Sequence, residues 1–209
     1  RDHAIMNIVT SAFGNAGQKC SACSLLLVER SVYEDKNFQD KLKDAATSIK
    51  VGSVWEAGNV VGPMITNRND KLLQALTLEP GESWLVPPKF IDEKQYILAP
   101  TVKWGVKPGS YSFRTELFGP MLSVACIDNL QQGIELVNSL DYGLTSGLQS
   151  LDENEQKLWK DSILAGNLYI NRGITGAIVN RQPFGGMKLS AFGGGVKAGG
   201  PNYCACLVK

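Results

Sequence analysis

The chain has 209 residues, 44% of them hydrophobic, which is enough for one good-sized globular domain. Its 21 basic and 20 acidic residues are scattered and leave a net charge of +1, which argues against a nucleic-acid or membrane-surface partner. No apolar run reaches the roughly 18 residues that a membrane helix needs, and the first residues do not form a signal peptide. The five cysteines are odd in number and irregularly spaced, which favours a reducing, cytoplasmic setting over a disulfide scaffold.

Helical and strand patterns alternate along most of the chain. In chain order we expect a helix over residues 4–13, a strand over 25–28, helical spacing over 32–49, a helix over 69–76, strands over 96–104 and 122–127, a helix over 130–139, a strand over 146–150, a helix over 152–164 and a strand over 168–170. This alternation predicts an α/β fold, a mainly parallel sheet with flanking helices, and one domain over residues 1–209.

Two segments break the pattern. Residues 79–95 are turn-rich and polar, and we expect them to form an excursion on the surface. Residues 171–202 hold nine glycines and two prolines, and a loop this long is usually functional or disordered.

The clearest chemical signal lies in residues 13–20, Phe-Gly-Asn-Ala-Gly-Gln-Lys-Cys. Here a cysteine leaves a helix through a Gly-containing turn and enters an apolar strand. Such a turn can present a sulfur atom at a cleft beside backbone N–H groups, which lower a thiol pKa and can hold an oxyanion. The alternative for Cys20 is a buried structural cysteine, which is the usual state of a free cysteine.

The other cysteines give weaker signals. Cys23 is expected in the core, and Cys204 and Cys206 are expected on one face of a strand. With His3 as the single histidine, we expect no metal site.

Residues 13–20 also resemble the cysteine signature of the aldehyde dehydrogenase superfamily. Further segments similar to motifs of this family follow in the family's order: Gly62-Pro63, Glu116–Pro120, Tyr142–Gly147, Gly166–Asn171 and Pro183–Gly186. One match can arise by chance, but an ordered series over nearly the whole chain is specific.

The resemblance implies a chemistry for three residues. Cys20 would attack an aldehyde and form a thiohemiacetal and then a thioester, which is covalent catalysis. Glu116 would hydrogen-bond the nicotinamide ribose of NAD, and Phe118 would pack near the nicotinamide ring. Taken alone, Glu116 could equally be a surface acid beside Arg114, and Phe118 could be part of the core.

The C-terminal part of the chain points to a substrate. Residues 175–186 and 197–201 are similar to glutamate γ-semialdehyde (Δ1-pyrroline-5-carboxylate) dehydrogenases of proline catabolism, and 78–86 and 166–173 to bifunctional proline utilisation proteins. By this resemblance the substrate's α-carboxylate would meet the backbone N–H groups of a glycine turn. The substrate-binding residues would be Ser21, Gly176, Ala177 and Phe184. Without the resemblance, the segment 173–177 reads as an ordinary turn.

The family also has parts that this sequence lacks. Its general base, its oxyanion asparagine and its Rossmann-type NAD-binding domain are absent from the chain, so we expect a catalytic-domain fragment that is inactive by itself. In the full enzyme we expect the NAD-binding domain of the same parent chain as a partner, and a homo-oligomer. Two alternatives stay open: a dehydrogenase for another aldehyde, and a non-catalytic module of the same fold.

Overall fold

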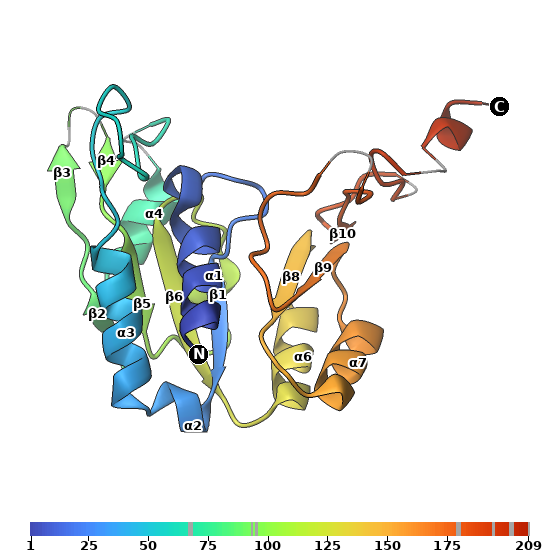
Figure 1. Ribbon diagram of the computed structural model, residues 1–209, viewed down its shortest axis with the longest axis horizontal. Helices are drawn as coiled ribbons and strands as arrows, with labels where there is room; N and C mark the ends of the chain where they lie inside the picture. Colours follow the sequence, from blue (N-terminus) through green and yellow to red (C-terminus); the bar gives the residue numbers. More distant parts are fainter. Residues whose placement is uncertain are drawn as a thin grey trace. The chain divides into compact units, whose positions relative to one another are not determined.

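The computed structural model describes residues 1–66, 69–92, 94, 96–178, 181–193, 195–200 and 203–208. The chain divides into two compact units, Arg1–Asn129 and Leu130–Lys209. Each unit has its own strands and helices (Figure 1).

The first unit is built on a four-stranded sheet. Its strands, in spatial order, are β1 (Leu25–Glu29), β6 (Met121–Ile127), β5 (Thr101–Trp104) and β2 (Ser83–Val86). The first three strands are parallel, and β2 joins the edge antiparallel to β5. Strand β6 lies inside the sheet and is buried except for half-buried Cys126, which is why it reads as an almost continuous apolar run. The predicted α/β fold with a mainly parallel sheet is confirmed.

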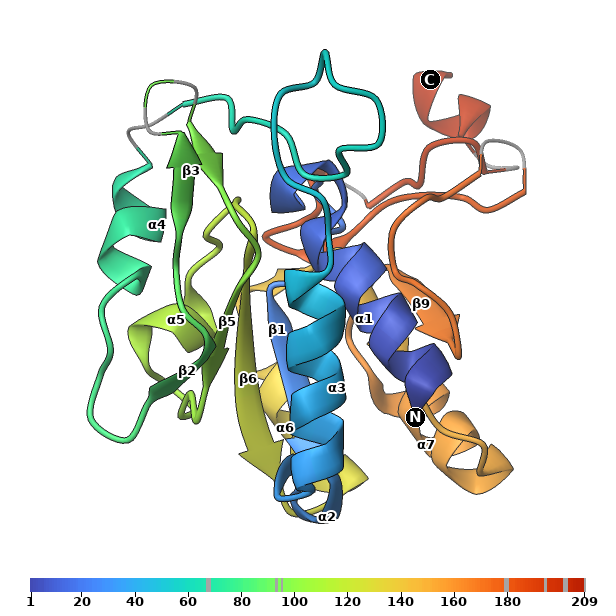
Figure 2. The same cartoon turned by 60° about the vertical axis from the view of Figure 1, so that its left-hand side comes forward.

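Helices cover this sheet. Those of the first unit are α1 (Asp2–Phe13), α2 (Arg30–Tyr33), α3 (Lys36–Thr47), α4 (Asp70–Ala75) and α5 (Tyr111–Arg114). Helices α1 and α3 lie side by side (Figure 2) and bury their apolar faces in one core. The side chain of Asp35 accepts the Asn37 N–H at 2.9 Å and so begins α3. The periodicity from residue 32 to 49 therefore belongs to two helices, not one.

The expectation for residues 79–95 was correct in part. Most of the described residues of the segment are exposed or half-buried, but the segment forms strands; residues 93 and 95 lie outside the described part of the chain. The segment contains β2 and β3 (Phe90–Asp92), and β3 pairs with the short strand β4 (Ile97–Leu98). It is also tied inward, because Glu82 forms an ion pair with Lys103 at 2.9 Å and both side chains are 1% exposed. The polar composition thus belongs to a mostly exposed segment, within which the Glu82 carboxylate is buried and paired.

The second unit is smaller. Its elements are α6 (Leu130–Asn138), β7 (Tyr142–Gly143), β8 (Thr145–Leu148), α7 (Glu153–Ser162), β9 (Asn167–Ile170), β10 (Met187–Lys188) and the 3-10 helix η2 (Cys204–Leu207). Strands β8 and β9 are parallel, and β7 and β10 are antiparallel. A small core of Ile134, Trp159 and Ile163 lies under the two helices. The strand expected around Cys204 was wrong, since this segment is a 3-10 helix.

Long-range hydrogen bonds hold the glycine-rich segment of the second unit. The Lys188 ammonium donates to the carbonyl oxygens of Val137, Asn138 and Leu140, at the end of α6 where carbonyl groups lack helical partners. Loss of water around this ammonium lowers the pKa of Lys188. None of the helices described is long and apolar enough to cross a membrane.

Candidate functional site

The turn before Cys20 has an unusual backbone. It is a short 3-10 segment, η1 (Gly14–Gly17), in which Asn15, Ala16 and Gly17 have φ values of 56°, 55° and 65°. For a residue with a Cβ, the left-handed region costs roughly 1–2 kcal/mol. Gly17 avoids that cost, and it also packs so closely on Gly119 that a Cβ would clash with the Gly119 carbonyl oxygen. The turn is therefore fixed by packing against the segment that follows Glu116.

Cys20 lies at the tip of the next turn. The Ala22 N–H donates to the Lys19 carbonyl oxygen at 2.9 Å, which places Cys20 and Ser21 at the two central positions. The Cys20 residue is exposed, whereas Ser21 is buried. The hydrogen bond that closes this turn joins Lys19 and Ala22 and does not use the Cys20 N–H. Cys20 is thus an exposed cysteine whose own backbone N–H lies in the same turn.

Two other cysteines of the first unit differ from Cys20. Cys23 is half-buried against the core, and its sulfur donates to the Leu25 carbonyl oxygen at 3.5 Å. Removal of its sulfur from water raises the pKa of Cys23 to about 12, although that hydrogen bond acts in the opposite direction. Burial also raises the pKa of the Cys126 thiol. Among the residues that the structure describes, no three His, Cys, Asp or Glu side chains gather as metal ligands would.

Hydrogen bonds hold the backbone of segment 116–120 in place, whereas Glu116 is exposed. Leu117 is 1% exposed, and its carbonyl oxygen accepts the Asn69 Nδ2 amide at 2.6 Å. Phe118 is half-buried and has a φ of 48°, a strained value for a residue with a large side chain. The side chain of Glu116 is exposed.

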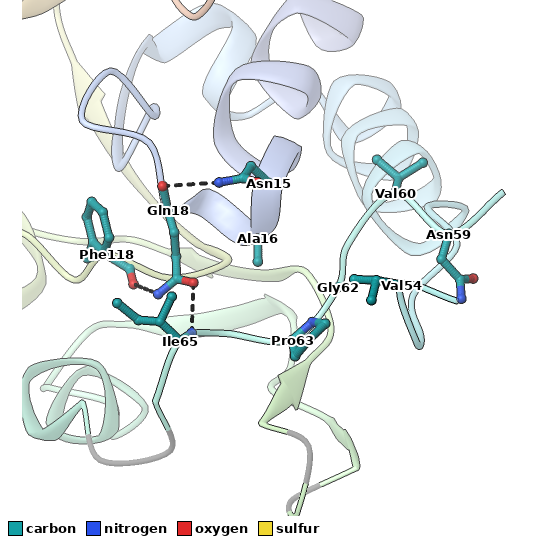
Figure 3. A pocket seen from close by; sticks show the side chains of 10 residues that line it. All are labelled: Asn15, Ala16, Gln18, Val54, Asn59, Val60, Gly62, Pro63, Ile65 and Phe118. Atoms are coloured by element: carbon teal, nitrogen blue, oxygen red, sulfur yellow. Dashed lines mark hydrogen bonds between the residues drawn. The ribbon is translucent and has the colours of Figure 1, made fainter. Parts of the chain in front are cut away.

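A pocket of about 320 Å³ opens beside these segments (Figure 3). It is lined by Asn15, Ala16, Gln18, Val54, Asn59, Val60, Gly62, Pro63, Ile65 and Phe118. Gln18 lies at its wall, between Phe118 and Ile65. The volume is at the lower end of the range of about 300–1,000 Å³ typical of small-molecule sites. The pocket therefore suits one ring system and its substituents rather than a whole dinucleotide.

The remaining predicted residues lie in the second unit. Gly176 is exposed, with a φ of 84° and no atom within 4 Å of the position a Cβ would take; Ala177 beside it is half-buried. Phe184 is half-buried, and its backbone N–H donates to the Ala198 carbonyl oxygen at 2.9 Å. The buried Asn167 side chain donates to the Pro183 carbonyl oxygen at 2.8 Å and accepts the Gly185 N–H at 3.0 Å. The two residues that flank Phe184, Pro183 and Gly185, are thus fixed by hydrogen bonds to the Asn167 side chain.

The structure brings some of the predicted residues together and shows others that sequence reasoning missed. Within the first unit, contacts of Gly17 and Gln18 join the cysteine turn to segment 116–120. The missed residues are carboxamides that bind backbone groups: Gln18, Asn69 and Asn167. Gln18 and Asn167 lie inside the motif segments 13–20 and 166–171, but the resemblance gave neither a role. Asn69 carries a local signal, because asparagine before a helix is a preferred N-cap, and its Oδ1 accepts the Leu72 N–H at 3.1 Å.

Comparison with known proteins agrees with this geometry. The model of the aldehyde dehydrogenase family matches residues 1–208. The chain belongs to the aldehyde dehydrogenase family. It is 35% identical over 202 residues to a 1-pyrroline-5-carboxylate dehydrogenase of Geobacillus kaustophilus, a match that covers 96% of this chain and 38% of that relative.

Two solved structures extend the likeness. The first is proline utilization A of Corynebacterium freiburgense, at 47% identity and a TM-score of 0.93, covering 99% of this chain and 21% of that one. The second is a Thermus 1-pyrroline-5-carboxylate dehydrogenase with bound NAD, at 32% identity and a TM-score of 0.89, covering 100% of this chain and 40% of that one. The chain thus spans well under half the length of these relatives.

Proposed function

We propose that this chain is the catalytic part of a longer, cytoplasmic enzyme that oxidises L-glutamate γ-semialdehyde to glutamate with NAD, with Cys20 as its nucleophile. The observation that carries the proposal is the exposed Cys20, which directly follows the turn of residues 14–17, where Gly17 packs on Gly119 of the segment of Glu116 and Phe118. Because the curated relative above is longer than this chain, we propose that the general base, the oxyanion asparagine and the NAD-binding domain come from other parts of the enzyme.

The chemistry of the chain's own residues follows from their placement. The Cys20 thiolate attacks the aldehyde carbon and forms a C–S bond, while the carbonyl oxygen becomes an oxyanion. The Cys20 backbone N–H stands at the turn tip, where it can hydrogen-bond that oxyanion. After the thiohemiacetal loses a hydride, water cleaves the resulting thioester, releases the carboxylic acid and returns the thiol.

Two residues of the first unit fit a role toward the cofactor. When bound, NAD supplies the hydride acceptor. The exposed Glu116 carboxylate offers two acceptor oxygens for ribose hydroxyls. Phe118 lines the pocket of about 320 Å³, which has room for a nicotinamide ring. Neither Cys20 nor Glu116 lines that pocket, so the proposal places NAD by Glu116 and Phe118 and not by the pocket as a whole.

Residues of the second unit are suited to bind the α-carboxylate of the substrate. The open space around Gly176 leaves its backbone and that of Ala177 accessible, so an α-carboxylate can approach their N–H groups. Phe184 would pack on the aliphatic carbons of the substrate. Substrates without the carboxylate would lose this anchor.

The test uses the whole enzyme that carries this chain. NADH formation is measured with glutamate γ-semialdehyde and with a simple alkyl aldehyde. We expect Cys20→Ala to lower the rate by at least about a thousandfold with normal folding, because no second nucleophile takes its place. Cys126→Ala is the control and should keep the rate within about twofold.

Each part of the proposal has its own contrary result. Equal rates with both aldehydes would remove the substrate assignment. Activity that survives Cys20→Ala would remove the nucleophile. An intact enzyme that oxidises no aldehyde, with a Cys20 thiol no more reactive than Cys126, would favour a structural module instead.

A further inference from the structure

The side chain of Gln18 joins three segments of the first unit. Its Nε2 donates to the Phe118 carbonyl oxygen at 3.2 Å, and its Oε1 accepts the Ile65 backbone N–H at 3.2 Å. Gln18 itself stands two residues before Cys20 and is fixed to the turn by the Asn15 Nδ2 amide, which donates to the Gln18 carbonyl oxygen at 3.2 Å. Figure 3 shows this carboxamide at the pocket wall.

The hydrogen bond from Gln18 is accepted by a residue whose backbone conformation is strained. With a φ of 48°, Phe118 needs support from its surroundings to keep this backbone conformation. Gln18 donates to its carbonyl oxygen at 3.2 Å, while the Asn69 Nδ2 amide donates to the Leu117 carbonyl oxygen at 2.6 Å and more weakly to that of Phe118 at 3.5 Å. If the Gln18 bond is lost, the peptide after Phe118 loses a partner, and the segment can relax toward a common conformation.

A glutamine is the suitable residue for this place because it offers a donor and an acceptor at the end of one side chain. A glutamate would present an acceptor to the Phe118 carbonyl oxygen and so repel it. A methionine of similar length would present neither group. Both bonds are therefore specific to the carboxamide.

We infer that Gln18 is a positioning residue that sets Glu116 and Phe118 in place relative to the turn of Cys20. The inference rests on the proposed function, in which segment 116–118 meets the cofactor and Cys20 meets the aldehyde. Gln18 lines the pocket, but both ends of its carboxamide are already bonded to backbone groups of the protein. It acts through the backbone of Phe118 on one side of the pocket and that of Ile65 on the other.

The kinetic test compares Gln18→Met with Gln39→Met in the whole enzyme. Gln39 is a matched control, since its Nε2 donates to a backbone carbonyl oxygen, that of Tyr33, at 2.9 Å, outside the residues of the site. We expect Gln18→Met to raise the KM for NAD about tenfold, as the loss of one to two hydrogen bonds predicts. The KM for glutamate γ-semialdehyde should stay within about twofold, and Gln39→Met should leave both KM values unchanged.

A second variant separates positioning from general packing. Gln18→Glu should impair NAD use at about pH 8 and begin to recover only as the pH falls toward about 5, because the ordinary pKa of a glutamate is about 4.3 and only the protonated carboxyl can again donate to the Phe118 oxygen. Gln18→Met should show no such recovery. A KM for NAD within about twofold of the natural enzyme in Gln18→Met would overturn the inference.

Amide hydrogen exchange decides the inference even if the enzyme oxidises no aldehyde. In Gln18→Met the Ile65 amide should exchange at least about tenfold faster, and the peptide of residues 116–120 should also exchange faster. Gln39→Met should change neither. Unchanged exchange at both places would overturn the role of Gln18, whereas an inactive natural enzyme with these exchange changes would overturn the proposed function alone.

Discussion

Two glycine turns, one in each unit, differ in what surrounds them. Gly17 and Gly176 both have positive φ values, 65° and 84°. A Cβ on Gly17 would meet the backbone of Gly119 and the Ala12 carbonyl oxygen, whereas a Cβ on Gly176 would meet no atom within 4 Å. The first glycine is required by packing inside the protein. The second is required by backbone conformation alone, and the space beside it is open.

The difference separates two ways in which glycine serves a site. In the turn of residues 14–17, close packing transmits the position of segment 116–120 to the residues that lead to Cys20. In the turn around Gly176, no described atom lies within 4 Å of the Cβ position, and the proposed function uses this space for the approach of the substrate's carboxylate. The closely packed turn at Gly17 and the open turn at Gly176 can therefore be distinguished by the atoms that an added Cβ would contact.

The largest expected effect is on the packed turn. Gly17→Ala should destabilise the protein by about 3 kcal/mol, because it adds left-handed strain and a clash with backbone that cannot move aside as a side chain would. Gly14→Ala is the control, since Gly14 has a φ of −54° and open space at the Cβ position. Urea unfolding measures both. Equal midpoints for the two variants would show that the contact with Gly119 is not tight.

The next largest expected effect is a difference in reactivity between the thiols of Cys20 and Cys23. At about pH 8.5 we expect iodoacetamide to alkylate Cys20 roughly fiftyfold faster than Cys23, because Cys20 is exposed and the pKa of Cys23 is raised to about 12. Mass spectrometry of the labelled peptides gives the ratio, and concentrated urea should abolish the difference. Since the unfolded Cys23 thiol titrates near 9.0 and the folded one near 12, the folded state should also lose stability as the pH rises above 9. Equal labelling in the folded protein would contradict the contrast.

A substitution in the turn around Gly176 should change the substrate specificity of the enzyme rather than its folding. Gly176→Val should lower kcat/KM for glutamate γ-semialdehyde about tenfold and change the value for an uncharged aldehyde much less, because the side chain fills the proposed carboxylate site. Gly193→Val is matched, since Gly193 has a φ of 60° and open space around it, so both variants carry similar strain. If both aldehydes suffer alike, Gly176 does not anchor the substrate.

The sequence predicted the elements whose burial follows a simple period. The helix at 4–13 and the strands at 25–28 and 122–127 appear as α1, β1 and β6, because apolar residues at helical spacing or in short runs have one way to be buried. Residues 79–95 were misjudged in part, because Glu82 is buried through its pairing with Lys103, a partner about twenty residues along the chain. No local pattern shows such a pair.

The candidate site was predictable to a similar degree. The order of motifs pointed to Cys20, Glu116 and Phe118, but it could not show that Gly17 packs on Gly119 or that the Gln18 carboxamide reaches Phe118 and Ile65. Those contacts join residues about fifty to a hundred positions apart. They exist only once the sheet has brought the loops at its ends together.

The smallest expected effect concerns Glu116, an exposed acid on a rigid segment. Glu116→Gln removes the charge but keeps the length and one acceptor oxygen, so we expect hydride transfer to slow about fivefold while the protein stays as stable as before. Single-turnover NADH formation measures that step apart from product release. The exposed acid Glu153, in the first turn of α7, supplies the control variant Glu153→Gln, which should leave the rate unchanged. A Glu116→Gln enzyme with an unaltered single-turnover rate would mark Glu116 as a surface acid beside Arg114, and the packed turn would then position Phe118 alone.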